Sequence, residues 1–297
     1  MKSRLAGVAL TAAASTAATA VWRWRSRVAE RFEAGDTSRR PRDAQGIVIG
    51  AEEIRLEGTS GHAVLVLHGF NDTPQSMAYL SARLHDAGYS VHAPRLPGHG
   101  RGLRDMAREA NADAWMEHVQ QCYSALRQSH HHVYLCGQSM GGALAVLQAQ
   151  AFPRTPALAL LAPFLGMPDA LQWQARLSTF MPAPYFRSTG GERSIHDAEA
   201  RRAALGPGIV TSTMLRGLRR VALAAEQALP GLSVPTCYIQ SVHDNRIAKE
   251  RAEQSYAALG VRDKEQHWLT GSGHIISADY EKDRVAETVL RWFERHP

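Results

Sequence analysis

The strongest constraint on the fold is an alternation of short apolar runs with segments of helical periodicity, which begins near Gly46. Such apolar runs are typical of strands buried on both faces, and they predict a mostly parallel sheet flanked by helices on both faces. The expected strands lie within residues 46–56, 62–69, 89–96, 131–137, 157–163, 235–244 and 265–274. The expected helices lie within residues 74–87, 113–128, 140–151, 248–259 and 280–295.

The alternation stops between residues 164 and 231. This stretch contains aromatic residues, prolines and a Gly-Gly pair, and it has no good strand pattern. Its second half has helical spacing over residues 211–229, with apolar side chains on one face and Arg216, Arg219 and Arg220 off that face. We therefore expect residues 164–231 to be inserted into one α/β core made of residues 46–163 and 232–297.

The N-terminal 45 residues are expected to stand apart from this core. An alanine-rich apolar run covers residues 5–21, and the sequence WRWRSR follows it. Three interpretations fit: a signal peptide cleaved near Ala18, an uncleaved membrane anchor with Trp22 and Trp24 at the interface, or a mobile amphipathic helix. Localisation is thus membrane-anchored or exported in the first two cases, and otherwise cytoplasmic. The polar residues 33–45 are predicted to be a linker.

Composition excludes several classes of partner. The formal net charge is +6, but the arginines are scattered and form no basic run with interleaved aromatics, so nucleic-acid binding is not expected. The three cysteines, Cys122, Cys136 and Cys237, have no CxxC spacing, which argues against a zinc site or a disulfide framework. The adjacent histidines at 130–132 do not converge on one ion. We expect no metal and no cofactor.

The sequence VYLCGQSMGG, at residues 133–142, joins a predicted strand directly to a predicted helix. A serine at such a junction fits a nucleophile elbow, a sharp turn that requires small residues two positions before and after the serine. Gly137 and Gly141 meet this requirement. The N-terminus of the following helix also favours developing negative charge. Ser139 is therefore the candidate nucleophile.

A serine hydroxyl needs a general base, and the chain contains 14 histidines. In hydrolases with this elbow, the acid and then the histidine follow the serine along the chain. Asp244 and His274 follow the last two predicted strands, so both are expected at the sheet edge that carries Ser139. We expect His274 to be the base and Asp244 its orienting carboxylate. Asp279 is closer to His274 in sequence, but it is expected to cap the final helix.

An oxyanion hole needs two N–H donors. The backbone N–H of Met140, the residue after the nucleophile, is one candidate. The other is the backbone N–H of Phe70, in the loop after the strand HAVLVLHG, where Gly69 lets the backbone come close. His68 is expected to support this loop from beneath, and Asp72 to order it.

Several segments together resemble the α/β-hydrolase superfamily, in particular its bacterial carboxylesterases and monoacylglycerol lipases. They occur in the expected order, with suitable gaps, between residues 63 and 293: LVLHGF, HAPRLPGHG, ADAWMEHV, CGQSMGG, QSVHDNRI and GSGHIISADYEKDRV. The resemblance implies an α/β-hydrolase fold, a triad of Ser139, Asp244 and His274, and an oxyanion hole at Phe70 and Met140. It also implies that residues 164–231 form a helical cap over an acyl pocket.

The sequence therefore predicts a serine hydrolase that cleaves carboxylic esters, with medium acyl chain esters or monoacylglycerols as the small-molecule substrates. A thioesterase or amidase with the same triad is an alternative. A non-catalytic, membrane-tethered binding protein with this fold is another. The sequence leaves the oligomeric state open.

Overall fold

The computed structural model describes residues 2–180 and 184–297, without the side chains of residues 2–18 and 179. Within these residues, seven strands form one sheet in the order β1-β3-β2-β4-β5-β8-β9. All neighbouring pairs are parallel except β1 and β3, which confirms the predicted α/β-hydrolase fold. The strands are β1 (Ile54–Leu56), β2 (His62–Leu67), β3 (Ser90–Ala93), β4 (His132–Gln138), β5 (Leu158–Leu161), β8 (Thr236–Ser241) and β9 (Lys264–Leu269).

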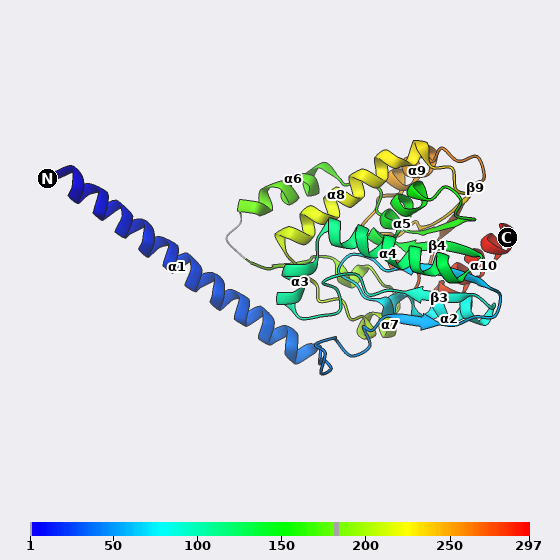
Figure 1. Cartoon of the computed structure of the whole chain (residues 1–297), viewed down its shortest axis with the longest axis horizontal. Coiled ribbons are helices and arrows are strands. Elements are labelled where there is room, and N and C mark those ends of the chain that lie inside the picture. Colours follow the sequence, from blue (N-terminus) through cyan, green and yellow to red (C-terminus); the bar gives the residue numbers. More distant parts are fainter. Residues whose placement is uncertain (1, 181–183) are drawn as a thin grey trace.

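Helices cover both faces of the sheet (Figure 1). Side chains alternate along β2, so that Leu65 and Leu67 join one apolar cluster while Val64 and Val66 join the other. The helices on the first side include α4 (Ala112–Ser129), α5 (Met140–Ala151), α8 (Ser212–Ala228) and α9 (Lys249–Ala258), and those on the second are α2 (Ala78–Asp86) and α10 (Lys282–Glu294). A short 3-10 turn, η1 (Pro74–Met77), leads into α2.

The first predicted strand, over residues 46–56, is wrong for most of its length, because only its last three residues form β1. Gly46 and Gly50 have φ angles of 78° and 89°, a left-handed conformation that glycine adopts at little cost and that interrupts a strand. The helix α3 (Leu103–Glu109) was not predicted. It has seven residues, of which Leu103 and Met106 are buried, too few for a helical pattern to be recognised.

The insertion between β5 and β8 contains only short elements before α8. They are α6 (Asp169–Leu177), η2 (Ser178–Phe180), β6 (Phe186–Arg187), η3 (Gly191–Arg193), α7 (Ala198–Ala203) and β7 (Ile209–Val210), and η4 (Leu229–Gly231) follows α8. The strands β6 and β7 form an antiparallel pair of two residues each. The apolar face of α8, which includes Met214, Leu218 and Val221, is buried in the core, so the insertion shares its packing with the α/β body.

The N-terminal helix α1 (Lys2–Arg39) projects from the body (Figure 1). The linker predicted from residue 33 is therefore wrong as far as Arg39. Its polar residues bind the body instead: Glu33 pairs with Arg104 at 2.7 Å, and Arg40, which also pairs with the buried Asp36, donates from Nη1 to the Leu205 carbonyl oxygen at 2.9 Å.

Among the described residues, no helix combines the length and the apolar character needed to cross a bilayer. The predictions of cleavage near Ala18 and of anchoring through residues 5–21 fall mostly on side chains outside the described set. Both stay predictions.

Candidate active site

Ser139 lies between the end of β4 and the start of α5, with φ 55° and ψ −118°. This is a strained conformation for a residue with a side chain. Neighbouring backbones come so close that a Cβ on Gly137 would lie 2.3 Å from the carbonyl oxygen of Gly141. A Cβ on Gly141 would lie 2.2 Å from the carbonyl oxygen of Leu67. Only glycine fits at either position, as a nucleophile elbow requires.

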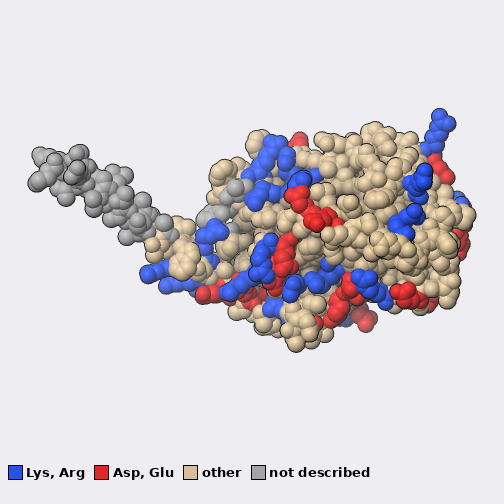
Figure 2. Space-filling model, in the orientation of Figure 1, with Lys and Arg blue, Asp and Glu red and all other residues tan. Residues whose placement is uncertain are grey.

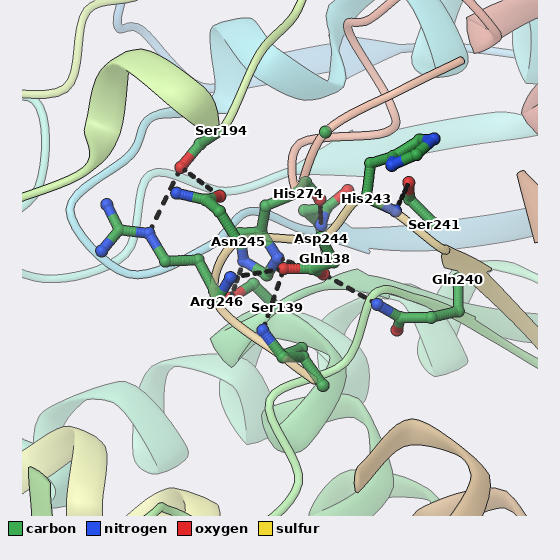
Figure 3. Close-up of polar contacts among 12 residues, drawn as sticks. Gln138, Ser139, Ser194, Gln240, Ser241, His243, Asp244, Asn245, Arg246 and His274 are labelled. Atoms are coloured by element: carbon green, nitrogen blue, oxygen red, sulfur yellow. Dashed lines mark hydrogen bonds and ion pairs between the residues drawn. The ribbon is translucent and has the colours of Figure 1, made fainter. Parts of the chain in front are cut away.

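The structure brings together the three side chains predicted to form a triad (Figure 3). The imidazole Nε2 of His274 lies 2.8 Å from Ser139 Oγ, and its Nδ1 lies 2.7 Å from Asp244 Oδ2. Asp244 and His274 follow β8 and β9, whose carboxyl ends lie at the same sheet edge as the elbow. Because the carboxylate of Asp244 can only accept a hydrogen bond, His274 Nδ1 carries the proton. His274 Nε2 is then free to accept the hydrogen bond of the Ser139 hydroxyl.

The surroundings of Asp244 keep it ionised. Burial alone would raise the pKa of its carboxyl, but His274 and the backbone N–H groups of Arg246 and Ile247 lower the pKa below its ordinary value. These N–H groups donate to Oδ1 at 2.7 and 2.9 Å. Gln240, on β8, donates from Nε2 to Oδ2 at 2.7 Å. The sequence analysis missed Gln240, because only the strand geometry shows that its amide reaches the acid four residues later.

The predicted oxyanion donors belong to segments that meet at Ser139. Met140 is the first residue of α5, and a Cβ on Gly69 would lie 3.3 Å from Ser139 Cβ, so the loop containing Phe70 passes beside the serine. Buried His68 supports this loop, since its Nδ1 lies 2.9 Å from the carbonyl oxygen of Gly69 and its Nε2 accepts the Leu96 N–H at 3.1 Å. Burial lowers the pKa of His68 well below its ordinary value, which keeps the imidazole neutral.

Asp72 lies in the same loop and is buried. Its carboxylate accepts the Thr73 N–H at 2.8 Å and the Ser76 hydroxyl at 2.6 Å, contacts that order the loop. Burial raises the pKa of Asp72 to about 6.

Asp279 does not cap the final helix with its side chain, so that prediction is wrong. Its fully buried carboxylate accepts N–H groups from Gly273 at 2.7 Å and from His196 and Asp197, each at 2.8 Å. One side chain therefore ties the loop of His274 to the insertion. The partners in the insertion are about 80 residues away in the sequence, and no local pattern indicates such a contact.

A second set of contacts joins the insertion to the loop of Asp244 (Figure 3). Asn245 donates from Nδ2 to the carbonyl oxygen of Gly190 at 2.7 Å, and Arg246 donates from Nε to Ser194 Oγ at 3.2 Å. The backbone carbonyl of Ser194 also accepts the Ile275 N–H at 2.8 Å, beside the histidine. The insertion thus touches both the loop that contains Asp244 and the loop that contains His274. The sequence analysis assigned no role to these residues.

Three potential metal ligands, Cys237, Glu265 and His267, lie together on β8 and β9 within the described part of the chain. They lie apart from the Ser139 elbow, and Glu265 is engaged by Arg295 at 2.5 Å and by His267 at 2.8 Å. Burial and the adjacent Glu265 raise the pKa of the Cys237 thiol well above its ordinary value. This disfavours the thiolate that a metal would need.

A mostly parallel sheet with a strained serine after a central strand, and with an acid and a histidine at the following strand ends, defines an α/β-hydrolase. A family model described as serine aminopeptidase, S33 (Hydrolase_4), matches residues 59–281. The chain belongs to this family.

Named relatives and solved structures are similar over most of the chain. A carboxylesterase of Bacillus subtilis (strain 168) is 26% identical over 78% of this chain and 92% of its own length. A thermostable monoacylglycerol lipase of Bacillus sp. (strain H-257) is 29% identical over 84% of this chain and 97% of its own length. A structure from work on the metagenome-derived lipolytic enzymes LipS and LipT has a TM-score of 0.76 and 28% identity, covering 84% of this chain and all of that one.

Proposed function

We propose that this carboxylic-ester hydrolase works as a serine esterase through an acyl-enzyme intermediate, with Ser139, His274 and Asp244 as its triad. The observation that carries the proposal is the 2.8 Å distance between Ser139 Oγ and His274 Nε2, on a serine whose backbone is held in the strained conformation of an elbow. A hydrogen bond to a positioned base is what a serine needs to become a nucleophile at neutral pH.

In the first half of the proposed reaction, Ser139 Oγ attacks the ester carbonyl carbon and its proton passes to His274 Nε2. Asp244 holds the imidazole in orientation and stabilises the positive charge it gains. The backbone N–H groups of Phe70 and Met140 stabilise the oxyanion of the tetrahedral intermediate. His274 then returns the proton to the leaving alcohol, and Ser139 remains acylated.

In the second half, a water molecule gives a proton to His274 Nε2 and attacks the acyl carbon. The carboxylic acid leaves, and the proton returns to Ser139 Oγ. Every proton in this cycle passes through one imidazole nitrogen. The scheme therefore needs no cofactor and no metal.

We further propose that residues 164–231 form a cap over the acyl pocket, and that medium acyl chain esters or monoacylglycerols are the substrates. The first residue of the insertion, Phe164, donates its N–H to the carbonyl oxygen of Ser139 at 3.0 Å, so the insertion starts directly beside the nucleophile. Its early residues Phe164, Leu165 and Met167 are buried apolar side chains. Apolar side chains in the segment that starts beside the serine favour an acyl chain over a charged substrate.

Hydrolysis of p-nitrophenyl esters with acyl chains of two to sixteen carbons would test the proposal. We expect measurable turnover with a maximum at medium length, and a loss of about 10⁴-fold or more in kcat for Ser139→Ala. The exposed Ser129 provides the control, since Ser129→Ala should keep full activity. Turnover that survives in Ser139→Ala would contradict the mechanism. Faster cleavage of matched thioesters or amides would instead favour the thioesterase or amidase alternative, and no turnover at all would favour the non-catalytic one.

A further inference from the structure

An arginine-rich hollow lies on the outer surface of the insertion, where α6 and α8 lie side by side. It has a volume of about 460 Å³. Figure 2 shows Lys and Arg side chains gathered at the end of the body that carries α6 and the start of α8. The described residues that line the hollow are Arg176, Arg216, Arg219, Arg220, Leu223, Ala224 and Gln227.

Four of the described residues that line the hollow are arginines. None of its described lining residues is acidic, and an ion pair of 2.7 Å joins Arg220 to Asp113 between two highly exposed side chains. The Nε of Arg219 is buried and has no hydrogen-bond partner among the described residues. Four guanidiniums around one hollow, with no acidic group among its described lining residues, are complementary to anionic groups such as phosphates.

Exposed apolar side chains lie next to these arginines. Trp173 and Leu177, four residues apart on one face of α6, are 59% and 55% exposed, and Phe180 is 84% exposed. The guanidinium of Arg176 lies over the Trp173 ring at 5.3 Å, which joins the apolar and basic groups into one surface. Exposed aromatic and aliphatic residues beside arginines are typical of surfaces that bind at the boundary between lipid head groups and acyl chains.

The N-terminal helix extends the same pattern. Trp22 and Trp24 of α1 are 67% and 45% exposed, and each is followed by an arginine. Figure 1 shows α1 projecting beyond the end of the body that carries α6 and the start of α8. The two tryptophan–arginine pairs of α1 therefore repeat the combination of exposed aromatic and basic groups found on α6.

We propose that the α6–α8 face, defined as Trp173, Arg176, Leu177, Phe180, Arg216, Arg219 and Arg220, docks peripherally on a membrane surface that contains anionic phospholipids. A free phosphate would engage the arginines but would leave Trp173, Leu177 and Phe180 in water. A bilayer interface supplies phosphates and an apolar layer together, so it satisfies both halves of the surface. The proposal is independent of the reaction at Ser139, because no residue of this face touches the triad.

Co-sedimentation of the full chain with vesicles tests the proposal. We expect binding to vesicles of phosphatidylcholine with 30% phosphatidylglycerol, and much weaker binding to phosphatidylcholine alone. Each arginine near an anionic surface contributes roughly a fivefold factor in partitioning, so Arg216→Gln with Arg219→Gln should weaken binding roughly 25-fold. Trp173→Gln should weaken it on both kinds of vesicle, because it removes the apolar contact.

The matched control is Arg154→Gln with Arg262→Gln, which removes two exposed arginines from loops elsewhere on the chain. The control should bind vesicles like the unaltered chain, and all variants should keep their melting temperature. All variants retain α1, so unchanged binding by the Arg216/Arg219 variant would overturn the proposal. Equal binding to both vesicle types would also overturn it. So would release of the protein from vesicles by inorganic phosphate to a greater extent than by sodium chloride at equal ionic strength. Tighter binding to RNA than to vesicles would overturn it as well.

Discussion

Asp244 Oδ2 accepts two hydrogen bonds, one from Gln240 Nε2 and one from His274 Nδ1, each at 2.7 Å. The Asp244 carboxylate is therefore held by a residue of β8 as well as by His274. If nearness to His274 were all that Asp244 required, the hydrogen bond from Gln240 would have no effect on activity. The geometry instead makes it a positioning residue, since it holds the oxygen toward which the imidazole points.

Replacing Gln240 by methionine should lower kcat about tenfold, because Asp244 loses a donor to its charged form and gains freedom to rotate. Loss of that donor should also raise the pKa of Asp244, so activity should fall off at a higher pH on acidification than in the unaltered enzyme. The measurement is kcat/KM against pH for a soluble ester. Gln266→Met, on the neighbouring strand β9, is the control. A profile that superimposes on that of the control would refute the role of Gln240.

Asp279→Asn should reduce stability and activity together. The carboxylate accepts four N–H groups, from His196, Asp197, Gly273 and Tyr280, and so holds the His274 loop against the insertion. An amide retains only one acceptor oxygen. We expect a loss of about 2 kcal/mol in the free energy of unfolding, together with a lower kcat. Denaturant unfolding and ester kinetics check this, with the exposed Asp86→Asn as control. A kcat equal to that of the control would show that the tether does not position the base.

Asp72→Asn should stabilise the protein at alkaline pH. Burial raises the folded-state pKa of Asp72 from 3.8 to about 6, so the folded state holds its proton more tightly than the unfolded state. Folding stability therefore falls as pH rises from about 4 to about 6, and the penalty persists above that range. Asparagine removes the charge. Its amide N–H can donate to Ser76 Oγ, whose own hydroxyl then donates to the Thr73 carbonyl oxygen.

The expected gain for Asp72→Asn is of the order of 2 kcal/mol at pH 8 and much smaller near pH 4. Denaturant unfolding of both proteins at the two pH values measures it. A difference between the two proteins that is the same at both pH values would contradict the assignment of a buried, ionised Asp72 at pH 8.

Gly141→Ala should prevent a normal elbow from forming. The new methyl group would lie 2.2 Å from a backbone oxygen of β2, which has no freedom to move away. We expect a loss of about 3 kcal/mol or more in stability and no measurable esterase activity. Gly191→Ala is the control, since no atom lies within 4 Å of the position that its methyl group would take. An active, stable Gly141→Ala enzyme would mean that the turn is looser than described.

The parts of the fold predicted well from the sequence are those with a strong local pattern. The helix at 140–151 and the apolar strand before Ser139 are continuous signals. The order of serine, acid and histidine leaves three of the 14 histidines after Asp244, and only His274 lies in the loop after the last predicted strand. The α5 helix begins and ends at the predicted residues.

The missed features depend on partners that are distant in sequence or on geometry that local patterns do not encode. Residues 33–39 have the composition of a linker, but burial of Asp36 against Arg40 and Arg42 makes them the end of a helix. Asp279 has the sequence position of a helix cap, but its carboxylate accepts backbone N–H groups of the insertion instead. Contacts with distant residues fix both features: Glu33 pairs with Arg104 and Arg40 donates to the Leu205 carbonyl oxygen, while Asp279 accepts N–H groups of His196 and Asp197.

The central claim is that Ser139 carries the acyl group during turnover, and intact-protein mass spectrometry tests it most directly. After rapid acid quenching of the enzyme with a p-nitrophenyl ester, we expect a mass increase equal to the acyl group, located by peptide mapping to the segment containing Ser139. The increase should be absent in Ser139→Ala. Turnover of the ester with an adduct on another residue, or an adduct that persists in Ser139→Ala, would contradict the account.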